Sequence, residues 1–455
     1  MVSMSKRLPF LVLAATLGAG VAVWAQAPAE PAPALTVPYT QFRLPNGLHV
    51  ILHQDKTVPV AAVNVWYHVG SGREKPGRTG FAHLFEHVMF EGSEHVPEGS
   101  FDTWLEAAGG NNNGSTSEDR TNYVTDVPSN ALELALFLES DRMGYLLPTL
   151  TQSKLDGQRD VVKNEKRQRV DNAPYGQAFI ELGAMLYPPG HPYSWPTIGS
   201  MEDLSAASLA DVVEFFKTYY TPNNASLVVA GDIEIEPTRA LVEKWFSGIP
   251  RGPDVPPMAP APVQLAEVKR KTITDRVQLP RLYLAWHTPA LLAPGDAAMD
   301  YVSSLLADGK NSRLYRRLVY ELQIAQDVNA AQQSQALGSV FLIVATARPG
   351  HTLDEIQKVI DEEIGKLAAA PPEAREMTRA LNQIEASFYR RMERTGSFGG
   401  KADQLNSYYT ATGMPDYFEE DLARYRAISA TDIQAAIQQF LPKDRRVELS
   451  VEPGK

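Results

Sequence analysis

The stretch His83-Leu-Phe-Glu-His87 is the most informative part of this sequence. It lies in a segment, 81–90, whose apolar residues recur with the spacing of a helix. Residues four positions apart on a helix lie one above the other, so the two imidazoles project from the same side. Two such imidazoles can hold a zinc ion at about 2.0–2.1 Å, and Glu86 can reach a water molecule without ligating the metal. The alternative interpretation is an ordinary amphipathic helix with His and Glu on its surface.

A catalytic zinc usually has a third protein ligand, and the sequence contains no cysteine that could provide it. Three carboxylates compete for this place, Glu139, Asp160 and Glu165, and composition does not choose among them. We expect Glu165, which lies in the charged stretch 159–169. The alternative for this stretch is a solvated helix face.

The segments on either side of the helix predict a sheet and a loop. Asn46-Gly47 lies between two apolar runs and predicts a hairpin over 42–53. Alternating apolar residues predict a strand over 60–69. Four glycines predict a loop over 70–80, and sites often form where such a loop meets a helix.

The two sides of a proline-rich segment, 250–262, resemble each other. On each side a Ser with an Asp three residues later opens a helix, at Ser208 and at Ser429, and a proline and a strand follow. This repetition indicates an internal duplication. Because predicted strands are neighbours in sequence, each half is expected to be an α+β domain. The expected parts are a signal peptide (1–25), a tether (26–38), a zinc-binding domain (39–249), a linker (250–268) and a second domain without a metal site (269–455).

The N-terminus has the pattern of a secretory signal peptide. Lys6 and Arg7 precede an apolar run, 8–24, and small residues allow cleavage after Ala25. We therefore expect a periplasmic or secreted protein without an integral membrane segment after cleavage; the alternative is an uncleaved anchor. The Pro/Ala-rich tether, 26–38, is expected to be stiff and unpacked.

Length and charge restrict the class of protein. The 455 residues suit two domains, and ordinary apolar content excludes a disordered chain. The formal charge is −11, and removal of Lys6 and Arg7 with the signal peptide makes it −13. Such a charge argues against nucleic acid as a partner.

These features resemble the pitrilysin–insulinase family of inverted zinc metallopeptidases, in particular two-domain bacterial members and mitochondrial processing peptidase subunits. The resemblance rests first on His83–His87, followed 78 residues later by Glu165 within Val161–Glu165. Further similar stretches are Phe42–Gly47, Arg78–Ala82, Gly109–Thr116, His191–Tyr193, Ile198-Gly199 and Tyr220–Asn224.

The resemblance implies a fold of two similar α+β domains, each an antiparallel β-sheet covered by α-helices. It implies one Zn²⁺ per chain, with His83, His87 and Glu165 as ligands, Glu86 as the general base and Asn113 positioning the substrate backbone. The expected function is an exported zinc metallopeptidase that hydrolyses peptides or unfolded polypeptides with a zinc-activated water. Two alternatives are a non-catalytic assembly or binding subunit of a heteromeric complex and a zinc-dependent hydrolase of a non-peptide amide.

The sequence departs from the family pattern in two places. Seven residues before Glu165, where some members carry an acid, stands Gln158, which we expect to tune the site as an outer-shell residue. The segment Val328–Val340 contains neither Arg nor Tyr, although active members often use such a pair from the second domain. We therefore expect a related partner subunit that carries the Arg/Tyr pair. The alternatives are a homodimer or another tyrosine of this chain, such as Tyr408 or Tyr409.

The remaining histidines have no metal-ligand spacing. His49, His53 and His68 are expected on the surface of the sheet, and His95 lacks helical register with the motif. The isolated His287 and His351 give no sign of a metal site in the second half.

Overall fold

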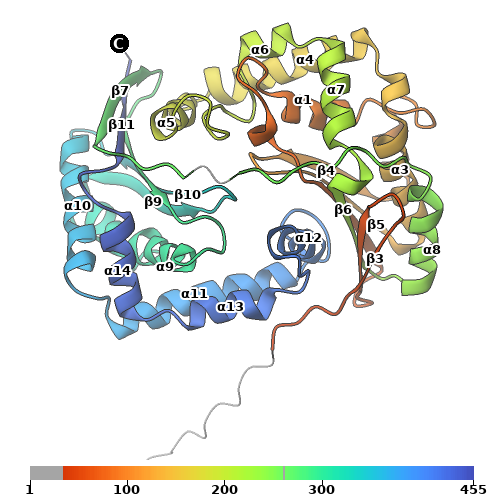
Figure 1. Ribbon diagram of the computed structural model, residues 1–455. Coiled ribbons are helices and arrows are strands. Elements are labelled where there is room, and N and C mark those ends of the chain that lie inside the picture. Colours follow the sequence, from red (N-terminus) through yellow and green to blue (C-terminus); the bar gives the residue numbers. More distant parts are fainter. Residues whose placement is uncertain (1–33, 260–261, 455) are drawn as a thin grey trace, which may run out of the picture. The chain divides into compact units, whose positions relative to one another are not determined.

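The computed structural model describes residues 34–259 and 262–454, which form two β-sheets with helices packed against them (Figure 1). The predicted signal peptide, 1–25, lies outside the described residues. Within the described ranges, no helix has both the length and the apolar character needed to cross a membrane. The predicted class, two similar sheets each covered by helices, is confirmed.

The first sheet has six strands, which lie in the order β1-β2-β6-β3-β5-β4. The Asn46-Gly47 hairpin is confirmed: Gly47 has a φ of 96°, and Arg43 pairs with His49 across the turn. Every neighbouring pair is antiparallel except β2 and β6, which are parallel. The strands are β1 (Thr40–Arg43), β2 (His49–Gln54), β3 (Val60–Tyr67), β4 (Asn111–Thr116), β5 (Thr121–Pro128) and β6 (Ala225–Gly231).

One face of this sheet forms the first core. The predicted strand face, Val63, Val65, Tyr67 and Val69, is fully buried there, as the alternation predicts. The helices α1, α3, α7 and α8 cover it with their apolar sides. Helices of the first half are α1 (Phe81–Val88), α2 (Ser100–Ala107), α3 (Leu132–Tyr145), α4 (Gln152–Lys166), α5 (Ala178–Leu186), α6 (Met201–Ala206), α7 (Leu209–Tyr219) and α8 (Ile235–Phe246).

The second sheet repeats the first without its first strand. Its order is β7-β11-β8-β10-β9, and β7 and β11 are parallel as β2 and β6 are. Its strands are β7 (Lys269–Asp275), β8 (Arg281–Thr288), β9 (Ala325–Gln333), β10 (Ser339–Ala347) and β11 (Val447–Pro453). Its helices are α9 (Asp296–Ala307), α10 (Leu353–Ala369), α11 (Ala374–Met392), α12 (Lys401–Thr412), α13 (Phe418–Arg426) and α14 (Ala430–Phe440).

The predicted duplication is visible in local detail. Ser208 opens α7 and Ser429 opens α14, each with a complete capping box in which the Asp three residues later returns the hydrogen bond. Each helix is followed by the strand that forms the parallel pair of its sheet, β6 or β11.

The two halves exchange helices, which the sequence did not predict. Helix α5 of the first half buries Ala178, Leu182 and Leu186 against the second sheet. Helix α12 of the second half packs against β2, β3 and β6 of the first sheet (Figure 1). Each sheet therefore has one face covered by its own helices and the other partly covered by a helix from the other half.

This exchange corrects two predictions. The strand histidines do not lie on an open surface: the ring of His49 stacks on Tyr409 of α12 at 3.9 Å, and burial lowers the pKa of His68 to about 4. The tether does pack at its end, since Val37 is buried and its N–H donates to Asp416. His53 Nδ1 lies 2.7 Å from the carbonyl oxygen of Pro38.

Asn406 anchors α12 to the first sheet. Its side chain is fully buried. Its Nδ2 donates to Oδ1 of Asn64 at 2.7 Å, and its Oδ1 accepts from the hydroxyl of Ser226 at 2.5 Å. One turn earlier, Asp403 accepts from the indole N–H of Trp66 at 2.9 Å. A buried polar group that loses its partner destabilises the fold, so this network depends on each of its members.

We predict that Asn406→Leu lowers the free energy of unfolding by about 2–4 kcal/mol, because two buried polar groups lose their partners. Urea unfolding followed by circular dichroism measures this. Ser407→Ala, on the same helix and without a side-chain hydrogen bond among the described residues, is the control and should unfold like the unmodified chain. Equal midpoints for Asn406→Leu and the control would show that the network does not hold α12.

Candidate metal centre

Helix α1 is fixed at its first turn by a buried carboxyl group. Gly80, at a φ of 88°, precedes the helix. The two oxygens of Glu74 accept hydrogen bonds from the N–H groups of Gly80 and Ala82, both at 2.8 Å. Burial raises the pKa of Glu74 to about 8, although these hydrogen bonds act in the opposite direction. These bonds satisfy N–H groups that a helix start leaves free, and they set the direction of α1.

The opposite side of α1 carries the histidines. Phe81, Leu84 and Phe85 are buried in the first core, whereas the side chains of His83 and His87 are 13% and 24% exposed. Their rings lie with centroids 4.8 Å apart. The prediction that both imidazoles project from one side of the helix agrees with this geometry.

Helix α4 packs against α1 and brings Glu165 to the histidines. Its Oε2 lies 3.2 Å from Nε2 of His87 and 3.6 Å from Nε2 of His83. The other oxygen, Oε1, receives an ion pair from Arg169 Nη1 at 2.6 Å. Glu165 is thus only 16% exposed on its side chain and does not lie on a solvated helix face.

The two competing carboxylates lie elsewhere. Glu139 is buried on α3, where it pairs with Arg142 and accepts from the hydroxyl of Thr125 at 2.8 Å. Asp160 is exposed on α4. Among the described residues, His83, His87 and Glu165 form the one group of three or more His, Asp and Glu side chains arranged to hold a metal.

The donor set fits zinc. Its three ligand atoms lie within 4.8 Å of one another. Tetrahedral ligands at 2.0–2.1 Å from a zinc ion are separated by about 3.3 Å, close to the two distances from Glu165. Burial, reinforced by the neighbouring His87, lowers the pKa of His83 to about 4, so its imidazole is neutral near pH 7. Neutral imidazole is the form that ligates a metal.

The carboxylate of Glu165 is also in its ligating form. The hydrogen bond with His87 lowers its pKa, and the charge of Arg169 acts in the same direction. Burial opposes these effects. The site therefore combines two imidazoles with one carboxylate, a set typical of open catalytic zinc sites.

Glu86 lies beside the histidines but faces strand β4. Its Oε2 accepts a hydrogen bond from the hydroxyl of Thr116 at 2.6 Å. A side chain in place of Gly114 would lie 3.0 Å from Cγ of Glu86, so the glycine allows this close approach. Burial raises the pKa of Glu86, which increases its affinity for a proton.

Two further predicted residues lie near the site. Asn113 is exposed on β4, which among the described residues pairs with β5 alone and so has a free edge. Gln158 donates its hydrogen bond to Glu91 rather than to either histidine. Burial raises the pKa of Glu91, and the charge of His87 lowers it, so any effect of Gln158 on the histidines passes through Glu91. The roles of Asn113 and Gln158 remain predictions.

A turn of the second half binds through its backbone near the hairpin that follows Thr116. The segment Val328–Val340 comprises the end of β9, a turn and the start of β10. The N–H of Ala336 donates to Asp119 at 3.0 Å, and the N–H of Leu337 donates to the hydroxyl of Tyr193 at 3.0 Å. This turn thereby docks on the hairpin that carries Thr116.

The tyrosines considered as substitutes are engaged elsewhere. The hydroxyl of Tyr408 is buried and donates to Asp421 at 2.8 Å, while Tyr409 stacks on His49. The isolated histidines also lie apart from the cluster, as expected: His95 pairs with Asp141, and His287 contacts the carbonyl oxygen of Leu186.

Comparison with known proteins identifies the family of this chain. The family model described as insulinase (peptidase family M16) matches residues 49–184, and the model described as peptidase M16 inactive domain matches 206–384. The zinc protease PqqE of Helicobacter pylori is 30% identical over 380 residues, which cover 82% of this chain and 84% of the relative.

The chain belongs to peptidase family M16. The predicted resemblance is confirmed. The crystal structure of a protease from Helicobacter pylori matches with a TM-score of 0.85 and 26% identity, covering 92% of this chain and all of that one. The probable mitochondrial-processing peptidase subunit beta of Arabidopsis thaliana is 24% identical over 419 residues, covering 90% of this chain and 77% of the relative. Relatives are named as zinc proteases, which places this chain in a metallopeptidase family.

Sequence analysis missed three residues that shape the site. Thr116 donates a hydrogen bond to Glu86, and Arg169 forms an ion pair with Glu165. Glu74 accepts hydrogen bonds at the start of α1. Arg169 follows Glu165 by four residues, and helical spacing could have indicated this pair. Thr116 and Glu74 act through contacts between separate elements, for which the sequence carries no local signal.

Proposed function

We propose that this chain is the zinc-bearing catalytic subunit of an exported M16 endopeptidase that hydrolyses peptides or unfolded polypeptides. The observation that supports it best is the convergence of His83 and His87 with Glu165, 78 residues away, beside a separately held Glu86. Export rests on the signal-peptide pattern of residues 1–25.

His83, His87 and Glu165 would hold one zinc ion per chain. When bound, zinc supplies Lewis-acid chemistry, which acidifies water and polarises a carbonyl group. Arg169 holds the second oxygen of Glu165 and restrains the rotation of its carboxylate. The buried environment keeps His83 neutral and ready to ligate.

Glu86 would act as the general base. Its carboxylate accepts a proton from the attacking water and later delivers it to the amine that leaves. The hydroxyl of Thr116 binds Oε2, so Oε1 is the oxygen that remains for this transfer. The raised pKa of Glu86 favours both steps, because a stronger base takes the proton more readily and still releases it to an amine.

The substrate would bind in extended form along the free edge of β4. An edge strand presents unpaired N–H and C=O groups that a peptide can complete as a further strand. Asn113 is exposed on this edge, one residue from Gly114, which touches Glu86. This arrangement would align a scissile bond with the metal site and favours a peptide over another amide.

A related partner subunit would complete the site. The segment Val328–Val340 offers no Arg or Tyr side chain, and its turn is bound to Asp119 and Tyr193 through backbone N–H groups. The similar protein of Arabidopsis thaliana is itself named as a subunit. The partner would supply the Arg/Tyr pair that holds the substrate; a homodimer is the alternative.

The main rival is a non-catalytic assembly subunit. The description "inactive domain" belongs to the match over 206–384, which includes none of His83, Glu86, His87 and Glu165. The complete ligand set and the positioned Glu86 therefore favour catalysis.

We predict that the purified mature chain contains one zinc per chain and that His87→Ala removes most of it, since two ligands hold zinc far more weakly than three. Elemental analysis after dialysis measures the zinc. His351→Ala, in the second half and outside the cluster, is the matched control and should retain zinc. Equal zinc in all three proteins would contradict the assignment.

We predict that Glu86→Gln keeps its zinc but cleaves an unfolded polypeptide on the order of 10²–10⁴-fold more slowly, because a general base is lost. Glu165→Gln should instead lose zinc affinity, since a neutral amide is a weaker ligand than a carboxylate. Metal content and cleavage are measured on the same preparations. Loss of zinc in Glu86→Gln with retention in Glu165→Gln would reverse the two roles.

We predict that the chain alone turns over slowly and that a related chain with an Arg/Tyr pair raises turnover about 10²–10³-fold, the usual effect of one oxyanion donor. Zinc content should not change on adding the partner. Peptide cleavage by the single chain, with its mass in solution, is compared with cleavage by the mixture. Full turnover by a monomer or homodimer, unchanged by the partner, would refute the proposal.

A further inference from the structure

A cavity of about 920 Å³ in the second half lies outside the metal site. Side chains of α9 and α11 line it, together with Asn329 and Ala330 of β9. Its charged residues are four arginines of α11 (Arg375, Arg379, Arg390 and Arg391), Asp300 of α9, and Asp308, which directly follows α9. This excess of positive charge is unexpected in a chain with a formal charge of −11.

Four arginines of α11 line the cavity, whereas two acids of this helix are ion-paired with other segments. Glu376 is paired with Arg313 from the segment before β9, and Glu385 is paired with Arg426 of α13. Between the arginines the cavity side carries only uncharged residues, such as Asn382 and Gln383. The residues of α11 that line the cavity therefore include four arginines and no acid.

Direct ion pairs of the cavity arginines are absent from the described part of the chain. Within the described ranges, no carboxylate oxygen lies within ion-pairing distance, 4.0 Å, of any of the four. Arg379 donates from Nη1 to the carbonyl oxygen of Asn311 at 2.8 Å, but its Nε and Nη2 atoms are buried and have no acceptor among the described residues. Buried guanidinium N–H groups without acceptors cost free energy, which an anionic ligand would recover.

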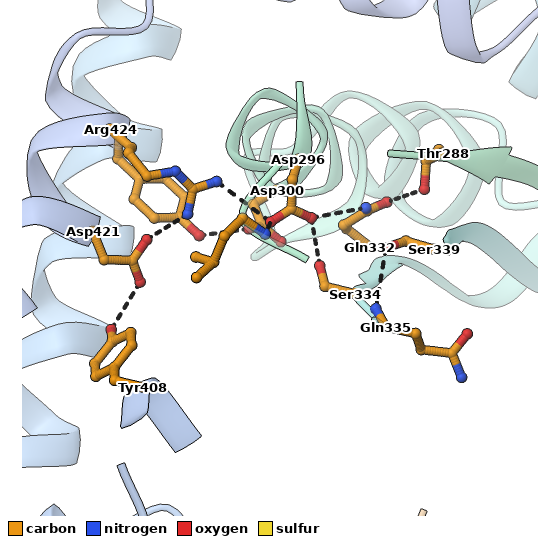
Figure 2. Close-up of polar contacts among 12 residues, drawn as sticks. Thr288, Asp296, Asp300, Gln332, Ser334, Gln335, Ser339, Tyr408, Asp421 and Arg424 are labelled. Atoms are coloured by element: carbon orange, nitrogen blue, oxygen red, sulfur yellow. Dashed lines mark hydrogen bonds and ion pairs between the residues drawn. The ribbon is translucent and has the colours of Figure 1, made fainter. Parts of the chain in front are cut away.

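Within the described ranges, neither aspartate is ion-paired with these arginines. Asp300 accepts a hydrogen bond from the hydroxyl of Tyr425 at 2.6 Å. Beside it, Arg424 joins Asp296 and Asp421 in a polar network (Figure 2). In that network Asp296 also binds Ser334 and Gln332, and so ties α9 to β9 and the turn after it (Figure 2). Asp308 is exposed near the end of α9. Asp300 is thus held in place by Tyr425, and the four arginines outnumber the two acids of the cavity.

The spacing of the arginines indicates the shape of the ligand. Arg375 and Arg390 are fifteen positions apart, which on a helix is about 22 Å. One phosphate group cannot span this distance, whereas about seven residues of extended peptide can. A flat lipid surface does not enter a cavity. Acidic side chains at intervals along a peptide would meet the arginines in turn.

The neighbouring strand favours the same ligand. In the described part of the chain β9 is the last strand of its sheet, so a peptide can add to its outer edge beside Asn329. At Ala330 the peptide would replace the hydroxyl of Ser303, which donates to the carbonyl oxygen of Ala330 at 3.0 Å. A few residues further on, Gln333 and Gln335 line a second cavity of about 490 Å³ that also contains Arg169, the partner of Glu165. An extended chain held along β9 would therefore run from the arginines toward the metal site.

We propose that the α11 arginines and the free edge of β9 form a binding site for an acidic segment of an extended polypeptide. That this polypeptide is a substrate rests on the proposed function; the binding itself does not. The site would select chains that carry several Asp or Glu residues at a distance from the cleaved bond.

The test is equilibrium binding to the full chain carrying Glu86→Gln, which prevents cleavage. The probe is a fluorescent peptide of about ten residues in which Glu alternates with Ser, long enough to span the arginines. Its counterpart has Gln in place of every Glu. The acidic peptide should bind on the order of 10-fold more tightly than its counterpart, since each exposed charge pair contributes a factor of about two to five. Added salt should weaken the binding.

Adding Arg375→Gln, Arg379→Gln and Arg390→Gln together should reduce binding of the acidic peptide to that of the neutral one. The matched control adds Arg251→Gln, Arg276→Gln and Arg445→Gln, which removes the same charge from exposed positions elsewhere and should bind normally. If the triple variant fails to fold by circular dichroism, Arg390→Gln alone, an exposed residue, should still weaken binding severalfold.

Three results would overturn the proposal. They are equal binding of the two peptides, equal loss of binding in the two triple variants, and arginine-dependent binding of inorganic phosphate or phosphatidylglycerol vesicles without binding of the peptide. Zinc content and cleavage are measured separately on the chain with Glu86 intact. A chain that binds the acidic peptide but neither holds zinc nor cleaves would contradict the proposed function. The proposal of a peptide-binding site would still hold.

Discussion

The buried carboxyl group of Glu74 at the first turn of α1 is the constraint on which the metal site depends. It binds two N–H groups at the point where the chain leaves a left-handed glycine and enters the helix. The apolar side of α1 is then committed to the first core, so the side that carries His83 and His87 must face α4. A small rotation of α1 would separate the histidines from Glu165, because ligand atoms around a zinc ion tolerate only a few tenths of an ångström.

Polar groups in the interior connect this site to the rest of the molecule. Thr116, which holds Glu86, ends the strand that leads into the hairpin where Asp119 receives the turn after β9. The same turn is tied through Ser334 to Asp296, and from there through Arg424 and Asp421 to Tyr408 of α12. Because α12 is anchored on the first sheet by Asn406, the two halves are joined by hydrogen bonds at more than one place.

Charge is distributed unevenly for a protein with a net charge of −11. Acidic residues dominate overall, yet four arginines of α11 that form no ion pair with a described residue line one cavity, and Arg169 lies at the metal site. A positive cavity in an acidic protein attracts anions locally while the remaining surface repels them. Such an arrangement suits selection among unfolded chains by charge pattern, since an extended chain has no fixed shape to recognise.

The sequence by itself determined those features that act over a few residues. Asn46-Gly47 fixed a hairpin, Ser208 and Ser429 fixed two helix starts, and the spacing of His83 and His87 placed both rings on one side of a helix. Backbone geometry and periodicity act at this range, so a local pattern is sufficient. The repetition of cap, helix and strand likewise revealed the duplication, because it is a comparison of the sequence with itself.

Only the tertiary structure decided which carboxylate completes the cluster. Glu139, Asp160 and Glu165 were equivalent by composition, and the packing of α4 on α1 separates them. Tertiary packing also brought the hydroxyl of Thr116 within hydrogen-bond distance of Glu86 and covered His49 with α12. It also packed a helix from the other half against each sheet. These contacts join residues tens to hundreds of positions apart. They depend on how buried surfaces fit together, which no local spacing encodes.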